Sequence, residues 1–172
     1  ASLLGAAVPA ETTGLRDGAL VIGTPKNSAA LKSLGWDANL EKLGPEGFLI
    51  RPATVSGHKV IVVASAGELG ALYGTFHLLR LMQTGRPISS LDVAEKPRIM
   101  LRMVNHWDNM DGSIERGYAG RSLWQWAELP GTISPRYADY ARALASIGMN
   151  ATSINNVNTG RNMQIFSPEF LP

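Results

Sequence analysis

The second half of the chain repeats one structural signal, and this repeat constrains the fold more than any other feature. Ser134-Pro135 and Ser167-Pro168 stand 33 residues apart, and each pairs a helix-capping serine with a proline suited to the first helical position. Two apolar runs, Ile99–Val104 and Met149–Ile154, precede these signals and are predicted to be strands, the first of them buried. A repeat of this size matches one strand–helix unit of a parallel sheet, so we predict an α/β fold.

The segment after Ser134-Pro135 has the spacing of a helix that packs on a sheet. Its apolar stripe consists of Tyr137, Tyr140, Ala141, Leu144 and Ile147. Gly148 is expected to end this helix.

The two ends of the sequence suggest a truncated chain. Ser167-Pro168 predicts the start of a helix, but only four residues follow Pro168, which is too few to form one. Pro172 is a mild objection to such a helix, because it lies at the limit of where a first helical turn tolerates proline. Ala1–Gly5 resembles the tail of a helix and suggests a cut at that end too.

The first half of the chain is predicted to form a small sheet with helices on one face. Its expected strands are Ala19–Gly23, Phe48–Arg51 and Lys59–Ala64, and Ser56-Gly57 is expected to join the last two as a hairpin. We place a first domain at residues 1–90 and a second at residues 91–172, with the junction near Ile88–Pro97.

Two helices are expected in this first domain. The shorter runs from Ser28 to Leu34, with Asn27 or Ser28 as its cap and Gly35 as its end. The longer runs from Gly67 to Thr84 and is closed by Gly85. Its helical spacing is carried by Leu69, Leu72, Tyr73, Phe76, Leu79 and Met82 or Gln83. The glycines at positions 67, 70 and 74 are predicted to allow close packing on the sheet.

The composition favours a packed globular protein and argues against several classes of partner. Of the 172 residues, 45% are hydrophobic and 17% are charged, so a packed core is expected. The net charge of +2 is small and the basic residues are scattered, which argues against nucleic acid binding. No apolar run reaches the roughly 18 residues of a membrane span. The start, ASLLGAAVPAE, lacks the basic region of a signal peptide.

No cofactor or metal is expected. The glycines of residues 67–74 differ from the dinucleotide fingerprint, and Val21–Lys26 is not a phosphate loop. No spacing of His, Asp and Glu suggests a metal site. Cysteine is absent, which excludes disulfides and thiolate chemistry. A nucleotide-binding domain is therefore the weakest functional hypothesis.

The loop Asn105–Gly120 (NHWDNMDGSIERGYAG) carries most of the functional information. Connections usually have about 4–6 residues, and long loops rich in polar and aromatic residues at the carboxyl end of a strand often bind ligands. Trp107 offers a flat face that suits a sugar ring, and polar residues rim it: Asn105, His106, Asp108 and Asn109. Alternatively, this indole plugs a loop core. His106 is either a general base or hydrogen-bond donor, or a structural group.

The charged residues of this loop each have two interpretations. Asp108 and Asp111 could be paired acids, yet Asp at a turn usually bonds its own backbone, and Asp111-Gly112-Ser113 is typical of such a turn. Glu115 and Arg116 either form a salt-bridged clamp, or Arg116 holds a substrate carboxylate with two hydrogen bonds.

A second polar loop follows the second predicted strand. If the two strands are parallel neighbours, Asn155, Asn156 and Asn158 open on the same face as the first loop. Their amides could bind sugar hydroxyls or stabilise left-handed turns. Trp124 and Trp126 are interpreted as packing residues first and as outer substrate contacts second.

Leu101–Gly120 (LRMVNHWDNMDGSIERGYAG), continued by Arg121–Trp124, closely resembles the family 67 α-glucuronidases among the glycoside hydrolases. Tyr73–Gly85 is similar to the helix that closes their N-terminal domain. Gly148–Asn150, leading to Asn155–Asn158, is similar to their second barrel strand and loop. The resemblance covers essentially the whole chain.

This resemblance implies a fold and an activity. The fold is a small N-terminal α/β domain followed by the first two strand–helix units of a (β/α)₈ TIM barrel. The activity is that of a xylan-degrading hydrolase. It removes glucuronic or 4-O-methylglucuronic acid, α-1,2-linked to the xylose of xylo-oligosaccharides, with inversion. The resemblance also implies a cytoplasmic or cell-associated location and a homodimeric parent enzyme.

The resemblance also implies roles for individual residues. Trp107 stacks on the uronic acid ring, Val157 lies against the 4-O-methyl group, Asn156 lines the same pocket and Glu115 sits near the active site. The family's acid, base and carboxylate ligands come from later strands. No catalytic residue is therefore expected in this chain, and the catalytic groups are expected downstream of Pro172.

Two hypotheses for the isolated chain follow. As an enzyme fragment without its catalytic groups, it is expected to be inactive and unstable alone. The alternative hypothesis is a non-catalytic carbohydrate-binding or scaffold module.

Overall fold

The computed structural model describes residues 14–154, which fall into two compact units that divide between Arg98 and Ile99. Among the helices of residues 14–154, none is long and apolar enough to cross a membrane. Some of the sequence-based expectations concern residues outside the described range, and these stay predictions: Ala1–Gly5, Asn155–Asn158, Ser167-Pro168 and Pro172.

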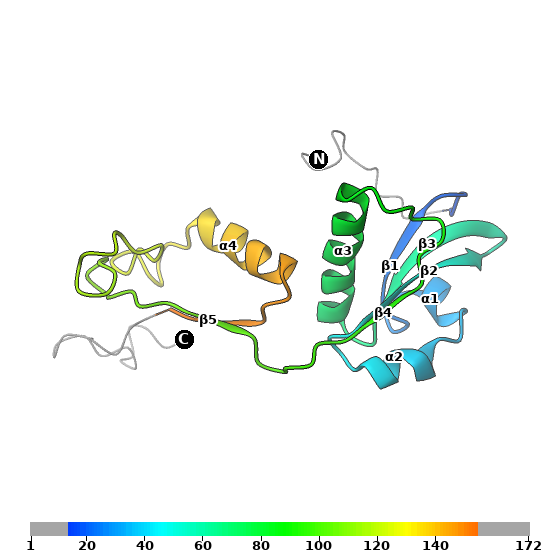
Figure 1. Ribbon diagram of the computed structural model, residues 1–172, viewed down its shortest axis with the longest axis horizontal. Helices are drawn as coiled ribbons and strands as arrows, with labels where there is room; N and C mark the ends of the chain where they lie inside the picture. The colour runs from blue at the N-terminus through cyan, green and yellow to red at the C-terminus, as the bar shows by residue number, and fades with distance from the viewer. Residues whose placement is uncertain (1–13, 155–172) are drawn as a thin grey trace. The chain divides into compact units, whose positions relative to one another are not determined.

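The first unit is built on a four-stranded mixed sheet (Figure 1). Its strands are β1 (Leu20–Gly23), β2 (Phe48–Val55), β3 (His58–Ala64) and β4 (Val93–Glu95), in the spatial order β1-β3-β2-β4. β3 pairs in parallel with β1 and antiparallel with β2, and β2 pairs antiparallel with β4. The three predicted strands are present. β4 is not predicted, because three residues inside an expected linker carry no detectable periodicity.

The turn between β2 and β3 confirms the predicted hairpin. Ser56 and Gly57 have φ values of 51° and 84°, and two positive φ values at the central positions give the turn that best matches the twist of paired strands. β2 extends beyond the predicted Arg51 and includes Pro52. β4 pairs only with Phe48–Ile50 and does not reach as far as Pro52. Pro52 therefore has no neighbouring strand on the β4 side and needs no backbone N–H to donate there.

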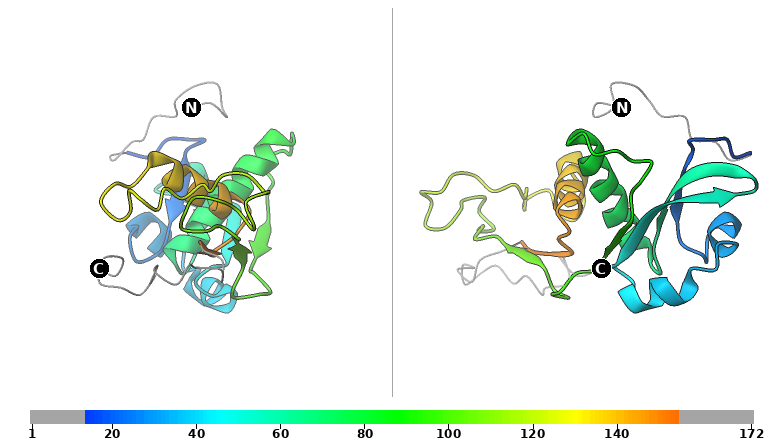
Figure 2. Two further views of the ribbon diagram at one scale, coloured as in Figure 1. Left: turned by 90° about the vertical axis from the view of Figure 1, so that its left-hand side faces the viewer. Right: turned by 45° about the vertical axis from the view of Figure 1, so that its right-hand side comes forward.

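Helices cover both faces of this sheet, which corrects the prediction of one covered face (Figure 1; Figure 2). On one face, α1 (Ala29–Lys32) and α2 (Asp37–Leu43) bury Leu31 and Leu40. They pack with strand residues Val21, Leu49, Val60 and Val62. α1 is capped by the Ser28 side chain, one of the two predicted caps. α2 is not predicted, because Trp36 precedes it without a side-chain cap.

The longer helix α3 (Glu68–Gln83) covers the opposite face, and glycines form its contact surface. A Cβ on Gly70 would stand 2.4 Å from the Gly47 carbonyl oxygen, and one on Gly74 would stand 2.7 Å from Val63 Cγ1. The predicted close approach at these glycines is confirmed. The apolar stripe does not define the buried face, however, because Leu69 and Leu72 are exposed. The helix lies too close to the sheet there for larger side chains.

The second unit contains a strand–helix–strand arrangement with a long loop (Figure 1). β5 (Met103–Asn105) and β6 (Ala151–Ser153) pair in parallel, and α4 (Pro135–Ser146) connects them. Ser134 caps α4 by accepting a hydrogen bond from the Arg136 amide, with Pro135 at the start, as predicted. Gly148, with φ of 78°, follows its end.

The predicted strand Ile99–Val104 is not buried, since Met103 is 48% exposed and Val104 is half-buried, and its first half is not a strand. Ile99, Met100 and Leu101 are 63–66% exposed, and the strand begins only at Met103. The carbonyls of Ile99 and Met100 accept hydrogen bonds from the Arg102 and Asn150 side chains instead of from a neighbouring strand. These side-chain donors replace the ladder bonds that would extend β5.

Candidate functional site

The loop between β5 and α4 is held in shape by hydrogen bonds of its own backbone. The Glu115 amide donates to the Trp107 carbonyl at 2.8 Å, and the Asn109 amide donates to the Ser113 carbonyl at 2.8 Å. The Ser122 amide donates to the Gly112 carbonyl at 2.9 Å. These bonds fold the loop back on itself, so that side chains distant in sequence come together around residues 106–108.

The side chains at the start of this loop alternate between two faces. Asn105 and Trp107 are exposed, Trp107 by 54%, whereas His106 is half-buried and Asp108 is only 2% exposed. Alternation with a period of two is the geometry of extended backbone. The predicted site residues therefore separate into an outward pair, Asn105 and Trp107, and an inward pair, His106 and Asp108.

The inward pair belongs to a chain of hydrogen bonds. His106 Nδ1 lies 3.3 Å from Asp108 Oδ1, and His106 Nε2 lies 2.5 Å from the Tyr140 hydroxyl on α4. Ser122 Oγ donates to Asp108 Oδ2 at 2.5 Å and accepts from the Trp124 amide at 2.9 Å. A carboxylate only accepts, so the Nδ1–H tautomer of His106 satisfies both of its neighbours, with the Tyr140 hydroxyl donating to Nε2.

Sequence reasoning did not find Ser122 or Tyr140 as partners of this site. Ser122 is 14 residues from Asp108, and Tyr140 is 34 residues from His106. The sequence predicts Tyr140 only as part of the apolar stripe of α4. No local spacing links these residues, because the bonds depend on how the loop returns to the helix.

An aromatic cluster supports the inward side of the loop. Trp124 and Trp126 are buried with Met110, and the Trp124 ring lies 5.0 Å from the Tyr137 ring and 5.8 Å from that of Tyr140. The interpretation of both tryptophans as packing residues is confirmed. Their burial fixes the outer half of the loop against α4.

Asp111 forms the predicted turn. Its Oδ1 accepts from the Ser113 hydroxyl at 2.6 Å and from the Ser113 amide at 2.8 Å, and Gly112 between them has φ of 83°. These hydrogen bonds, that of the Ser113 side chain first, hold the pKa of the Asp111 carboxyl below its usual range. A turn-forming carboxylate with a lowered pKa is a poor proton donor at neutral pH.

The predicted salt bridge between Glu115 and Arg116 is not found among the ion pairs of residues 14–154. Glu115 has a positive φ of 57°, and its carbonyl accepts a hydrogen bond from the Asn109 side chain at 2.6 Å. The Arg116 side chain is exposed. This leaves the guanidinium accessible for an external anion.

The second predicted loop, which contains Asn155, Asn156 and Asn158, lies outside the described residues. β5 and β6 are parallel neighbours, so the carboxyl ends of both strands lie at the same edge of the sheet. Asn156 and Val157 themselves lie outside the described residues. Within residues 14–154, no group of three His, Cys, Asp or Glu side chains is arranged to hold a metal ion.

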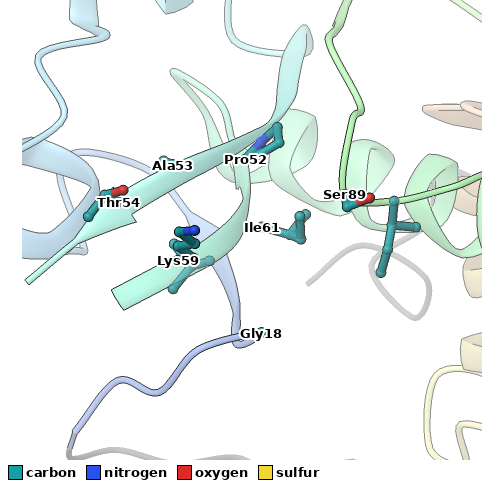
Figure 3. Close-up of a pocket in the computed structure, with 9 residues that line it drawn as sticks. Gly18, Pro52, Ala53, Thr54, Lys59, Ile61 and Ser89 are labelled. Carbon is teal, nitrogen blue, oxygen red and sulfur yellow. The ribbon is translucent and has the colours of Figure 1, made fainter. Parts of the chain in front are cut away.

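The first unit contains a separate pocket of about 520 Å³ beside the β2–β3 hairpin (Figure 3). It is lined by Gly18, Pro52, Ala53, Thr54, Lys59, Val60, Ile61, Ile88 and Ser89. Among the lining residues that the structure describes, Lys59 is the single charged residue and none is a carboxylate. The described lining therefore does not supply the acid pair that glycoside hydrolysis uses.

Comparison with known proteins identifies the family. Residues 1–78 match the glycosyl hydrolase family 67 N-terminus, and residues 81–172 match the glycosyl hydrolase family 67 middle domain. The chain belongs to glycosyl hydrolase family 67. In this family 67 chain, the first match lies in the unit built on the four-stranded sheet, and the second includes the candidate loop.

Relatives of this family 67 chain are named α-glucuronidases. It is 41% identical over 135 residues to a probable alpha-glucuronidase A from Aspergillus terreus, covering 77% of this chain and 15% of the relative. It is 36% identical over 163 residues to that of Neosartorya fischeri, covering 94% and 18%. An alpha-glucuronidase A from Emericella nidulans is 37% identical over 146 residues, covering 81% and 16%. The chain thus spans less than a fifth of the length of these relatives.

Proposed function

We propose that the protein is part of an α-glucuronidase of xylan degradation. The reaction is removal of glucuronic or 4-O-methylglucuronic acid from its α-1,2 linkage to the xylose of xylo-oligosaccharides, with inversion. Family 67 membership and the names of the relatives support this proposal. The described part of the chain is proposed to supply one wall of the substrate site.

The observation that carries the proposal is the exposed indole of Trp107. A side chain of this size that is 54% exposed has a large unused apolar face, although it stands in a loop held by hydrogen bonds and by a buried aromatic cluster. A sugar ring presents C–H groups on one face and hydroxyls at its rim, which suits an indole with polar neighbours. Asn105, on the same face, offers an amide to such a rim.

Other residues are proposed to complete this wall. Arg116 is an exposed cation and suits the carboxylate of the uronic acid. Asn156 and Val157 are proposed to face the same sugar from the next loop, with Val157 against the 4-O-methyl group. Glu115, whose carbonyl and amide are both used within the loop, is proposed to border the site. His106 and Asp108 are proposed to contribute to the site indirectly, from the inward face of the loop, without contacting the sugar.

We also propose how the chain divides. Residues 1–90 form the N-terminal domain, and residues 91–172 begin a (β/α)₈ barrel. The order β5–α4–β6 with parallel strands is the repeating unit of such barrels and supports this assignment. Loops at the carboxyl ends of barrel strands carry the active sites of these folds, which agrees with the candidate loop after β5.

The described carboxylates of the loop are not proposed as the catalytic pair. An inverting glycosidase needs an acid and a base roughly 6.5–9.5 Å apart, with a water between them. Asp108 is buried and accepts two hydrogen bonds within the protein, and Asp111 is committed to a turn with a lowered pKa. Both groups are thereby withdrawn from a reacting sugar.

The catalytic acid and base are instead proposed to lie downstream of Pro172 in the full-length enzyme. The relatives are more than five times as long as the stretch that they share with this chain, so they contain room for such strands. Pro172 itself lies outside the described residues, and this assignment stays a prediction.

Replacing Trp107 tests the proposed sugar platform in a full-length family 67 enzyme that carries this sequence. Trp107→Ala should reduce release of glucuronic acid from aldouronic acids by at least about ten-fold, since a stacking face worth about 1.4 kcal/mol or more is lost. Tyr118→Ala is the matched control, because Tyr118 is an aromatic residue of the same loop with 75% exposure. Equal activity of Trp107→Ala and the control, at unchanged melting temperature, would contradict the platform.

The isolated 172-residue chain distinguishes the enzyme fragment from a stand-alone binding module. Without a catalytic pair it should release no glucuronic acid from aldouronic acids. The module hypothesis instead requires the isolated chain to bind these sugars as tightly as a full-length family 67 enzyme does. Calorimetric titration of both proteins with one aldouronic acid separates these outcomes.

A further inference from the structure

The buried carboxylate of Asp108 needs an explanation beyond packing. Its side chain is almost fully buried, although the adjacent Trp107 is exposed, and burying a charge costs free energy unless its hydrogen bonds are complete. Apolar groups of similar shape often stabilise such sites as well or better. A carboxylate with two specific partners, His106 and Ser122, is better suited to fixing a geometry than to adding stability.

The hydrogen bonds of Asp108 connect three parts of the second unit. Ser122, from the returning end of the loop, donates to one carboxylate oxygen, and His106, from the end of β5, faces the other. The opposite edge of the imidazole meets the Tyr140 hydroxyl of α4. The rings of His106 and Tyr140 also pack edge to face, with centroids 5.4 Å apart. The strand end, the loop and the helix are thus held by one continuous chain of side chains.

Trp107 lies between the two anchored residues. His106 is held by Tyr140 and by the bond from its amide to the Ser153 carbonyl at 3.1 Å, and Asp108 is held from inside the loop. The Trp107 carbonyl accepts from the Glu115 amide. With the backbone fixed on both sides, the indole direction depends only on its two side-chain torsions.

We propose that Asp108 and Tyr140 are positioning residues that act through His106 to orient the indole of Trp107 toward substrate. This proposal rests on the function proposed above, in which Trp107 stacks on a uronic acid. Asp108 selects the His106 tautomer, and the Tyr140 hydroxyl fixes the ring against α4. Neither group touches the sugar.

The chain provides a matched pair of variants for the test. Tyr140 and Tyr137 both lie on α4, both pack against Trp124, and both hydroxyls are hydrogen-bonded, but only Tyr140 contacts His106. The Tyr137 hydroxyl accepts from the Gln125 amide at 2.7 Å. Tyr140→Phe and Tyr137→Phe therefore remove equivalent atoms, and only the first breaks the proposed chain.

NMR of the ¹⁵N-labelled 172-residue chain gives the readout. The chain has three histidines and four tryptophans, so the His106 ring and the Trp107 indole N–H can be assigned with single substitutions. Wild-type His106 should be the Nδ1–H tautomer. Tyr140→Phe should mix the tautomers and shift the Trp107 indole resonance. In a full-length family 67 enzyme that carries this sequence, it should also weaken glucuronic acid binding about three- to ten-fold, the size of one hydrogen bond. Tyr137→Phe should change none of the three.

The outcomes separate this inference from the proposed function. An unchanged His106 tautomer and Trp107 resonance in Tyr140→Phe would overturn the positioning role, whether or not the sugar binds. Equal loss of glucuronic acid binding in both variants would overturn it as well. Absence of glucuronic acid binding by the wild-type full-length enzyme counts against the sugar wall instead, while the tautomer and indole signals still decide whether Tyr140 and Asp108 position Trp107.

Discussion

Asp108 and Asp111 stand in one loop and have opposite environments. Asp108 is buried with its oxygens facing His106 and Ser122, whereas Asp111 lies at the surface and its Oδ1 accepts hydrogen bonds from Ser113 in its own turn. Residue type alone would make either a candidate acid. Their environments make Asp108 a proposed positioning residue and Asp111 a turn residue.

Replacement of Asp111 by Asn should therefore leave catalysis nearly intact. The amide oxygen can still accept from Ser113, so the turn is kept while the carboxylate is lost. We expect kcat of a full-length family 67 enzyme carrying Asp111→Asn to stay within about two-fold, whereas loss of a general acid costs about 10²–10⁴-fold. A fall of that larger size, with unchanged melting temperature, would make Asp111 catalytic.

The lowered pKa of His77 should make the free energy of unfolding of the first unit depend on pH. Burial of its ring, which lies 5.4 Å from Phe48, lowers the pKa of His77 below its ordinary value of about 6.5, and Arg80 adds to this effect while Glu95 opposes it. Because the pKa is lower in the folded state, the unfolded chain binds more protons as the pH falls. This contribution is present above pH 6.5 and is lost below it.

Substitution of His77 by Gln removes this titration. The free energy of unfolding of the wild type should fall more steeply between pH 7.5 and pH 5 than that of His77→Gln, as measured by urea denaturation across this range. The comparison uses slopes, so a constant packing effect of Gln cancels. Parallel curves would show that protonation of His77 is not linked to folding.

At the scale of elements, the packing of α3 depends on missing side chains rather than on large ones. Gly70 and Gly74 lie over Gly47, Ser65 and Val63 at distances that leave no room for a Cβ. A hydrophobic stripe identifies a helix reliably, but the face that it buries is decided by how closely the sheet approaches. Here the close approach turns Leu69 and Leu72 away from the core.

Gly70→Ala should consequently destabilise the first unit. Its Cβ would stand 2.1 Å from Ser65 Oγ and 2.4 Å from the Gly47 carbonyl, and backbone cannot move aside cheaply. Overpacking costs roughly 1–3 kcal/mol, with a backbone clash this close at the upper end, and alanine's helix propensity offsets about 1 kcal/mol, so a net loss of about 2 kcal/mol is expected in urea denaturation. Gly131→Ala, whose Cβ would meet its nearest atom at 3.5 Å, is the control and should have little effect. An unchanged or higher stability of Gly70→Ala would contradict close packing.

Across the whole molecule, local patterns anticipated most elements and few of the contacts between them. The hairpin at Ser56-Gly57 and the cap at Ser134 follow from residues adjacent in sequence. The covering of both faces depends on α2 at one face and on the glycine contacts of α3 at the other, and neither feature has a strong periodic pattern. The candidate loop was recognised from its composition, but the bond between His106 and Tyr140 joins residues 34 apart and has no local signature.

The two units should also differ in how strongly they resist local opening. β3 is buried over Val60–Ala64 and covered on both faces, whereas α4 has no buried residue, and Ile99 and Ile147 of the same unit are exposed by more than 60%. Amide exchange follows the free energy of the opening that exposes each amide, so elements with few buried apolar contacts exchange first. In the 172-residue chain, amides of β3 should therefore exchange at least about 100-fold more slowly than those of α4, measured by hydrogen–deuterium exchange with NMR or mass spectrometry. Equal protection of both elements would mean that the second unit gains as much stability from its hydrogen-bonded loop as the first gains from its core. In that case the His106–Asp108 chain would contribute to folding as well as to the orientation of Trp107.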